Sequence, residues 1–126
     1  MAYHVSKAEF GKLVERALAE LPARFADFLE EVPIEIRRKP SKEMLKQLGL
    51  GEDELLLGLY TGPSLLDRSV SDMARMPNVI FIFQEDVELA SDSEAGLVGE
   101  IRTTVLHEIG HHFGMDEEDL DELGYG

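Results

Sequence analysis

The spacing of apolar side chains along the first part of the chain predicts three helices. Ser6-x-x-Glu9 is a capping box, which satisfies the first free amide groups of a helix, and apolar residues follow it at three- and four-residue intervals. The predicted buried stripe of this helix is Phe10, Leu13, Val14, Ala17, Leu18 and Leu21. A proline then interrupts the pattern and favours a new helical start, so residues 23–31 are predicted as a second segment. A short helix between Ser41 and Gly49 follows.

Three stretches have the patterns of strands. Residues 32–37 alternate apolar and polar side chains, which predicts a half-buried strand. Residues 55–60 are apolar apart from one glycine, and residues 79–83 are β-branched or aromatic throughout, which predicts burial of this last strand on both faces. Residues 84–86 are polar and end it, while residues 65–70 are a candidate return strand. The order of these elements predicts an α+β domain with its helices against one sheet.

The last third contains the longest amphipathic stretch. Ser91-x-x-Glu94 fits a capping box, and Gly114 is a suitable helix stop. The apolar stripe between them is Leu97, Val98, Ile101, Val105, Leu106 and Ile109. Three glycines inside this helix lower its intrinsic stability, so we expect it to depend on packing or on close approach of another backbone; they are Gly96, Gly99 and Gly110.

The chemistry of the chain is concentrated on this helix. His107 and His111 are four residues apart and project from one helix face, so their imidazoles can converge on one metal ion, with the carboxylate of Glu108 beside them. A catalytic zinc usually has three protein ligands and a water, so a third ligand is required. The candidates are Asp116 and Glu117, and Asp116 fits the N-cap of a short helix over residues 117–123, which leaves Glu117 as the predicted ligand.

The motif over residues 107–117, His-Glu-x-x-His-His-Phe-Gly-x-x-Glu, and the closing Leu-Gly-Tyr-Gly at 123–126 resemble the mini-zincins. These are small bacterial zincin-like metallopeptidases with the pattern HExxHxxGxxD. Glu117 stands where that pattern has aspartate, one methylene shorter. The resemblance implies a minimal zincin-like domain over residues 1–126, with a small mixed twisted sheet, an active-site helix under it and a single zinc ion.

The function predicted from motif and resemblance is that of a zinc-dependent metallopeptidase, a neutral protease. Zinc held by His107, His111 and Glu117 would activate a water, and Glu108 would act as general base. Tyr125 is a candidate stabiliser of the oxyanion, although its position also fits simple packing. His112 has no partner at ligand spacing, so a hydrogen-bonded surface role is favoured over a fourth ligand.

A second function fits the same residues. The chain has 126 residues, which leaves few for specificity pockets, so a zinc-binding adaptor or peptide-binding protein with little or no turnover is the alternative. A metal-dependent ribonuclease is disfavoured because the formal net charge is −14 and phosphate binding needs a basic surface. The same charge argues against nucleic acid and anionic membranes as partners. The metallopeptidase function that the motif and the resemblance imply makes a peptide or unfolded protein substrate the expected partner.

The composition of the chain bears on the cellular compartment in which the protein is expected. There is no cysteine, which excludes disulfides and thiolate metal sites. No run of about 18 apolar residues is present, and charged residues interrupt the N-terminal segment where a signal peptide would be apolar. We therefore expect a cytoplasmic protein. His4 is distant in sequence from the other histidines and is expected near a mobile terminus.

Overall fold

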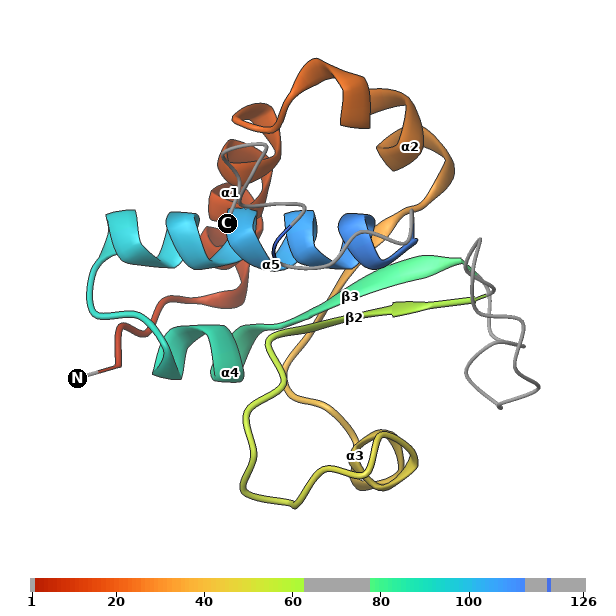
Figure 1. Ribbon diagram of the computed structural model, residues 1–126. Helices are drawn as coiled ribbons and strands as arrows, with labels where there is room; N and C mark the ends of the chain where they lie inside the picture. The colour runs from red at the N-terminus through yellow and green to blue at the C-terminus, as the bar shows by residue number, and fades with distance from the viewer. Residues whose placement is uncertain (1, 63–77, 113–117, 119–126) are drawn as a thin grey trace.

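The computed structural model describes residues 2–62, 78–112 and 118 (Figure 1). Its fold is α+β, as predicted. The elements in chain order are α1 (Lys7–Ala19), the 3₁₀ helix η1 (Ala23–Phe25), α2 (Ala26–Glu31), β1 (Ile34–Arg37), α3 (Lys42–Gln47), β2 (Gly58–Thr61), β3 (Val79–Phe83), α4 (Gln84–Leu89) and α5 (Glu94–His112). No helix in these ranges combines the length and the apolar character that crossing a membrane requires.

The three strands form one mixed sheet in the order β1-β3-β2. β1 is parallel to β3 and β2 is antiparallel to it, so β3 is the centre and the other two strands are edges of the described sheet. Every residue of β3 is buried, which confirms the predicted strand and its double burial. The boundaries of β3 are those expected from the unbroken run of β-branched and aromatic side chains.

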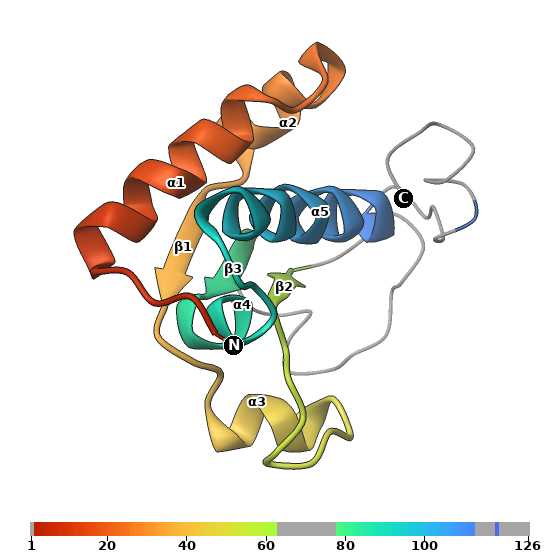
Figure 2. The same ribbon diagram turned by 90° about the vertical axis from the view of Figure 1, so that its left-hand side faces the viewer.

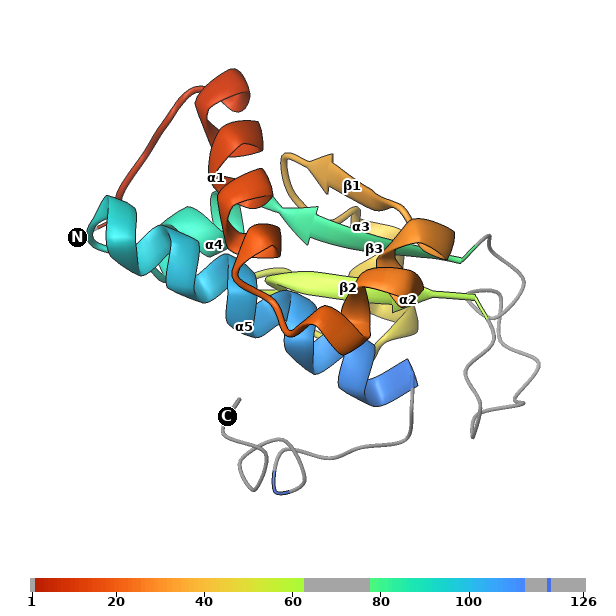
Figure 3. The same cartoon turned by 90° about the horizontal axis from the view of Figure 1, so that it is seen from above.

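The helices cover both faces of the sheet. α1, α2 and α5 lie on one face, α3 lies on the other, and α4 continues directly from β3 (Figures 1 and 2). Because alternate side chains of β3 point to opposite faces, Ile80 and Ile82 join the large cluster with α1, α2 and α5, whereas Phe81 and Phe83 join a smaller one against which Met44 of α3 packs. The long helix α5 runs beside β2 (Figure 3).

Two predicted helix starts are confirmed and one is wrong. The side-chain oxygen of Ser6 accepts a hydrogen bond from the amide of Glu9, and Ser41 caps α3 in the same way. At the start of α5, however, Ser93 is the capping residue, because its hydroxyl accepts the amide of Gly96 at 3.0 Å. Ser91 instead donates its hydroxyl to the carbonyl of Val87 at 2.8 Å and belongs to the end of α4.

The region around β2 and α4 differs from the predicted elements. The predicted strand over residues 55–60 is shifted, since β2 covers Gly58–Thr61. Residues 84–86 do end β3, but they also begin α4, a helix that the sequence pattern did not predict. The candidate return strand at 65–70, the stop at Gly114 and the short helix at 117–123 lie outside the continuously described ranges.

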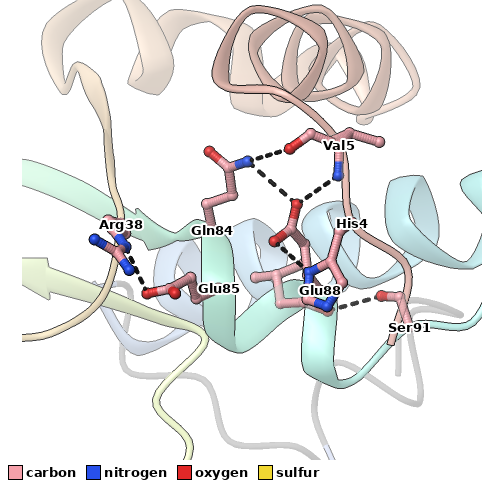
Figure 4. A network of polar contacts seen from close by, with 8 residues as sticks. His4, Val5, Arg38, Gln84, Glu85, Glu88 and Ser91 are labelled. Carbon is pink, nitrogen blue, oxygen red and sulfur yellow. Dashed lines mark hydrogen bonds and ion pairs between the residues drawn. The ribbon is translucent and has the colours of Figure 1, made fainter. Parts of the chain in front are cut away.

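The N-terminal segment is anchored by a buried carboxylate on α4. Glu88 has 3% of its surface exposed, and its Oε2 accepts hydrogen bonds from the amide of Val5 at 2.9 Å and from Gln84 Nε2 at 3.2 Å (Figure 4). Its Oε1 lies 3.2 Å from Nδ1 of His4. The amide of Tyr3 also donates to the Glu88 carbonyl. His4, expected near a mobile terminus, is therefore tied to the core through α4.

The donors around Glu88 set its charge state. Burial raises the pKa of the Glu88 carboxyl, but the hydrogen bonds from Val5, Gln84 and His4 and the charge of His4 together outweigh burial and hold the pKa below its ordinary value. A carboxyl whose pKa is depressed by folding stabilises the folded state above its unfolded pKa of about 4.3. That stabilisation is lost as the pH falls through the folded value.

Substitution of Glu88 tests this anchor. Glu88→Ala leaves the partly buried Val5 amide without its acceptor, so the free energy of unfolding should fall by about 1–3 kcal/mol at neutral pH. Glu88→Gln keeps an acceptor but removes the charge, so its deficit relative to wild type in urea denaturation should be larger at about pH 6 than at about pH 3.5. A deficit that is equal at both pH values would contradict the role of the ionised carboxylate.

Candidate metal helix and its strand

The face of α5 that was predicted to be buried is buried. The apolar stripe from Leu97 to Ile109 packs into the large core cluster. His107 and Glu108 are half-buried and lie at the edge of this stripe. Since α5 is continuous through His112, the backbone places His107 and His111 on one face, about 6 Å apart along the helix axis.

Several predicted site residues are not placed by the structure. The described side chains of α5 end at Gly110, so the side chains of His111 and His112 are outside them. Asp116, Glu117 and Tyr125 also lie outside the described residues. Within the described residues, no three histidine, aspartate or glutamate side chains form a group that could hold a metal ion.

Glu108 is bonded to the edge of the sheet. Its Oε1 accepts a hydrogen bond from the backbone amide of Tyr60 in β2, at 2.7 Å. In the antiparallel register Tyr60 pairs with Ile80, and the Ile80 amide donates to the Pro33 carbonyl on the β1 side. Tyr60 is therefore at a position whose amide points away from β3. The Glu108 carboxylate therefore accepts a hydrogen bond from an amide that faces away from β3 and takes no part in the pairing of β2 with β3.

A glycine permits this close approach of β2 to α5. A Cβ atom added to Gly58 would overlap Cγ2 of Thr104 and would stand 3.0 Å from the carbonyl oxygen of Phe81. The same Cβ would be 3.9 Å from Cγ of Glu108. Thr104 and Glu108 are one helical turn apart and face the strand together. The missing side chain at position 58 thus sets the separation between strand and helix.

The Tyr60 side chain is also fixed. Its ring stacks on Phe28 of α2 with centroids 6.3 Å apart, and its hydroxyl donates to Oδ1 of Asn78 at 3.2 Å. Burial raises the pKa of the Tyr60 phenol, so it is neutral at physiological pH. Gly62 has a φ of +97°, a backbone conformation that favours glycine, and follows directly after β2.

The segment that leads into β2 is held by α4 and by the last residue of β3. The amide of Leu56 donates to Oδ2 of Asp86 at 2.8 Å, while the carbonyl of Leu57 accepts the amide of Phe83 at 2.9 Å. Burial raises the pKa of the Asp86 carboxyl, as does the nearby charge of Glu85, and the Leu56 hydrogen bond only partly offsets this. Because Leu56 bonds a side chain and not a neighbouring strand, β2 begins later than its apolar run predicts.

This geometry agrees with the family comparisons. The profile of a family described as zincin-like metallopeptidases matches residues 29–126. The chain belongs to this family. Among solved structures it is similar to a conserved hypothetical protein (TTHA0227) from Thermo thermophilus, with 22% identity, a TM-score of 0.55, and coverage of 86% of this chain and 94% of that one. That likeness concerns the fold. A search of curated proteins gave no match.

The donor set of this zincin-like chain fits a zinc ion as far as the structure describes it. His107 and the backbone of His111 have the spacing of two imidazole ligands on a regular helix. The neighbouring carboxylate of Glu108 is bonded to the strand, so it is turned toward the edge of the sheet. A third donor would have to come from residues outside the described part.

Sequence reasoning did not identify the groups that surround Glu108. Gly58, Thr104 and the Tyr60 amide were not candidates, because none of them carries a metal ligand or an acid-base group. The available signal was the glycine inside the apolar run at 55–60, since an isolated glycine in a strand often marks close approach of another backbone. One expectation for the glycines of α5 was that another backbone approaches them closely. This is not the case at Gly99, where no described atom lies within 4 Å of an added Cβ.

Asp86 gives a test of how β2 is positioned. A raised folded pKa means that the charged form opposes folding, and that this cost grows as the pH rises through the folded pKa. Asp86→Asn retains an acceptor for the Leu56 amide without the charge, so its unfolding midpoint in urea should equal or exceed that of wild type at about pH 7 and lose this advantage at about pH 4. Asp86→Ala should instead cost about 1–2 kcal/mol. Equal losses in the two variants at neutral pH would contradict the assigned environment.

Proposed function

We propose that this chain is a zinc-dependent metallopeptidase that hydrolyses peptide bonds in peptides or unfolded proteins. The observation that supports the proposal is the placement of Glu108, which is half-buried beside His107 and bonded at 2.7 Å to the edge strand β2. A carboxylate with this position can act on a substrate that lies along the strand. Membership of the zincin-like family supports the same reaction class.

The proposed roles follow from the helix and the strand. His107, His111 and Glu117 would hold the zinc ion, which when bound supplies Lewis-acid polarisation and lowers the pKa of a water to about 7. Glu108 takes the proton of the attacking water and passes it to the leaving amine. No covalent intermediate with the protein is needed.

The outer edge of β2 is the proposed place for the substrate backbone. In the described sheet β2 has one neighbouring strand, β3, so the backbone groups of Gly58 point away from the sheet, next to the Tyr60 amide that is bonded to Glu108. An extended peptide can add to such an edge through main-chain hydrogen bonds, which depend little on its side chains. This fits a substrate class defined by an unfolded backbone more than by sequence.

Glu108→Gln separates catalysis from metal binding. The variant should bind one zinc ion per chain, as the wild type should, because Glu108 is not a proposed ligand, while cleavage of a diverse peptide library should fall at least about 100-fold. Zinc content is measured on purified protein and cleavage by mass spectrometry. A wild type that binds zinc stoichiometrically and cleaves no peptide would instead support the zinc-binding adaptor.

The third ligand is tested by a pair of adjacent substitutions. Glu117→Ala should weaken zinc binding far more than Asp116→Ala, because Asp116 is predicted to cap the helix at 117–123. Loss of a cap should cost about 1 kcal/mol of stability and leave the zinc affinity nearly unchanged. Competition with a chelator gives the two affinities, and the reverse order would assign the third ligand to Asp116.

A further inference from the structure

We propose that Gly58 is a positioning residue for the reaction assigned to this site. Its lack of a side chain lets β2 approach α5 closely enough for the Tyr60 amide to orient the carboxylate of Glu108. This inference rests on the proposed function, because it explains how the general base is aligned. It depends on three contacts, namely the Gly58–Thr104 approach, the Tyr60–Glu108 hydrogen bond and the pairing of β2 with β3.

The hydrogen bond from the Tyr60 amide restricts the rotation of the Glu108 carboxylate, which the side chain by itself does not restrict. The terminal torsion of a glutamate, which turns its carboxylate plane, has a broad energy profile. A donor at 2.7 Å from Oε1 fixes that oxygen, and the second oxygen is then fixed with it. A general base must lie within hydrogen-bond reach of the proton that it accepts. The Tyr60 amide therefore contributes alignment to the base.

The donor is rigid because it belongs to a paired strand. Tyr60 lies opposite Ile80 of the central strand, and its ring is held by Phe28 and Asn78. A backbone amide in such a strand has no rotamer freedom to lose when it binds the carboxylate. The donor position is thus set by the sheet before any substrate arrives, which is the condition for preorganised catalysis.

The separation of strand and helix then determines whether the donor reaches the base. An added Cβ at position 58 would overlap Thr104 and press on the Phe81 carbonyl. Since β2 is paired with β3, the helix has to move away, and Glu108 moves with it because it lies one turn after Thr104 on the same face. A misplacement of about 1 Å can reduce catalysis about 100-fold.

Four variants of the full chain test the inference. Gly58→Ala adds the offending Cβ, and Thr104→Ile enlarges the same contact from the helix side, which provides a second route should the first variant fail to fold. Gly58→Ala combined with Thr104→Ser removes the methyl group that the new Cβ meets. Gly99→Ala is the matched control, because the same change there meets no described atom within 4 Å.

Two readouts are measured. With zinc-loaded protein, Gly58→Ala and Thr104→Ile should lower kcat for a peptide substrate by about 10- to 100-fold, with a much smaller change in KM. The Thr104→Ser combination should recover a substantial part of kcat, and Gly99→Ala should match wild type. In the zinc-free protein, the Tyr60 amide resonance should shift and lose protection from hydrogen exchange in the two disruptive variants, and it should recover in the combination.

The outcomes separate this inference from the proposed function. If Glu108→Gln abolishes cleavage but Gly58→Ala and Thr104→Ile retain the wild-type kcat, the positioning role is wrong and the peptidase assignment stands. If the wild type cleaves no peptide, the proposed function fails, and a positioning role in catalysis fails with it. The zinc-free amide measurement still decides the structural step, since an unchanged Tyr60 resonance in both disruptive variants would show that Gly58 does not set this hydrogen bond.

Discussion

The close contact between β2 and α5 is the constraint on which the arrangement of the candidate site depends. Gly58 allows the strand to lie directly against Thr104, and two residues later the Tyr60 amide meets Glu108. The strand is fixed by its pairing with β3, and the helix is fixed by its apolar stripe in the core. The packing of the sheet and of α5 therefore determines the relative position of the Tyr60 amide and the Glu108 carboxylate.

α4 contributes to this arrangement through two buried carboxylates with opposite environments. Glu88 receives several donors and anchors the N-terminal segment, whereas Asp86 receives the amide of Leu56 just before β2. The consequence is an opposite effect on their pKa values, lowered for Glu88 and raised for Asp86. α4 continues directly from β3, so the hydrogen bonds of Glu88 and Asp86 connect two distant segments to the end of the central strand. The Asp86 bond fixes the position of Leu56, and with it the start of β2, relative to β3.

The elements that the sequence predicted well are those whose signal is local. β3 follows from its unbroken run of β-branched and aromatic residues, and the buried stripe of α5 follows from the three- and four-residue period of its apolar side chains. His107 and Glu108 lie on this helix, as its pattern predicts. α4 was not predicted, because a helix of 6 residues is too short to show an apolar period and its stabilising bonds are to distant segments. The choice of Ser91 as a cap failed for a related reason, since its hydroxyl is used by α4.

The alignment of Glu108 could not be predicted, because its partner is a backbone amide 48 residues away. Every residue except proline has such an amide, so the residue type at position 60 does not indicate this hydrogen bond. The close packing of β2 against α5 is indicated in the sequence, because it requires a glycine, Gly58, within an apolar strand. A backbone donor also suits a chain of 126 residues, because it is held by the sheet and needs no further side chains to support it. The motif on α5 thus locates Glu108, and the edge of the sheet orients its carboxylate.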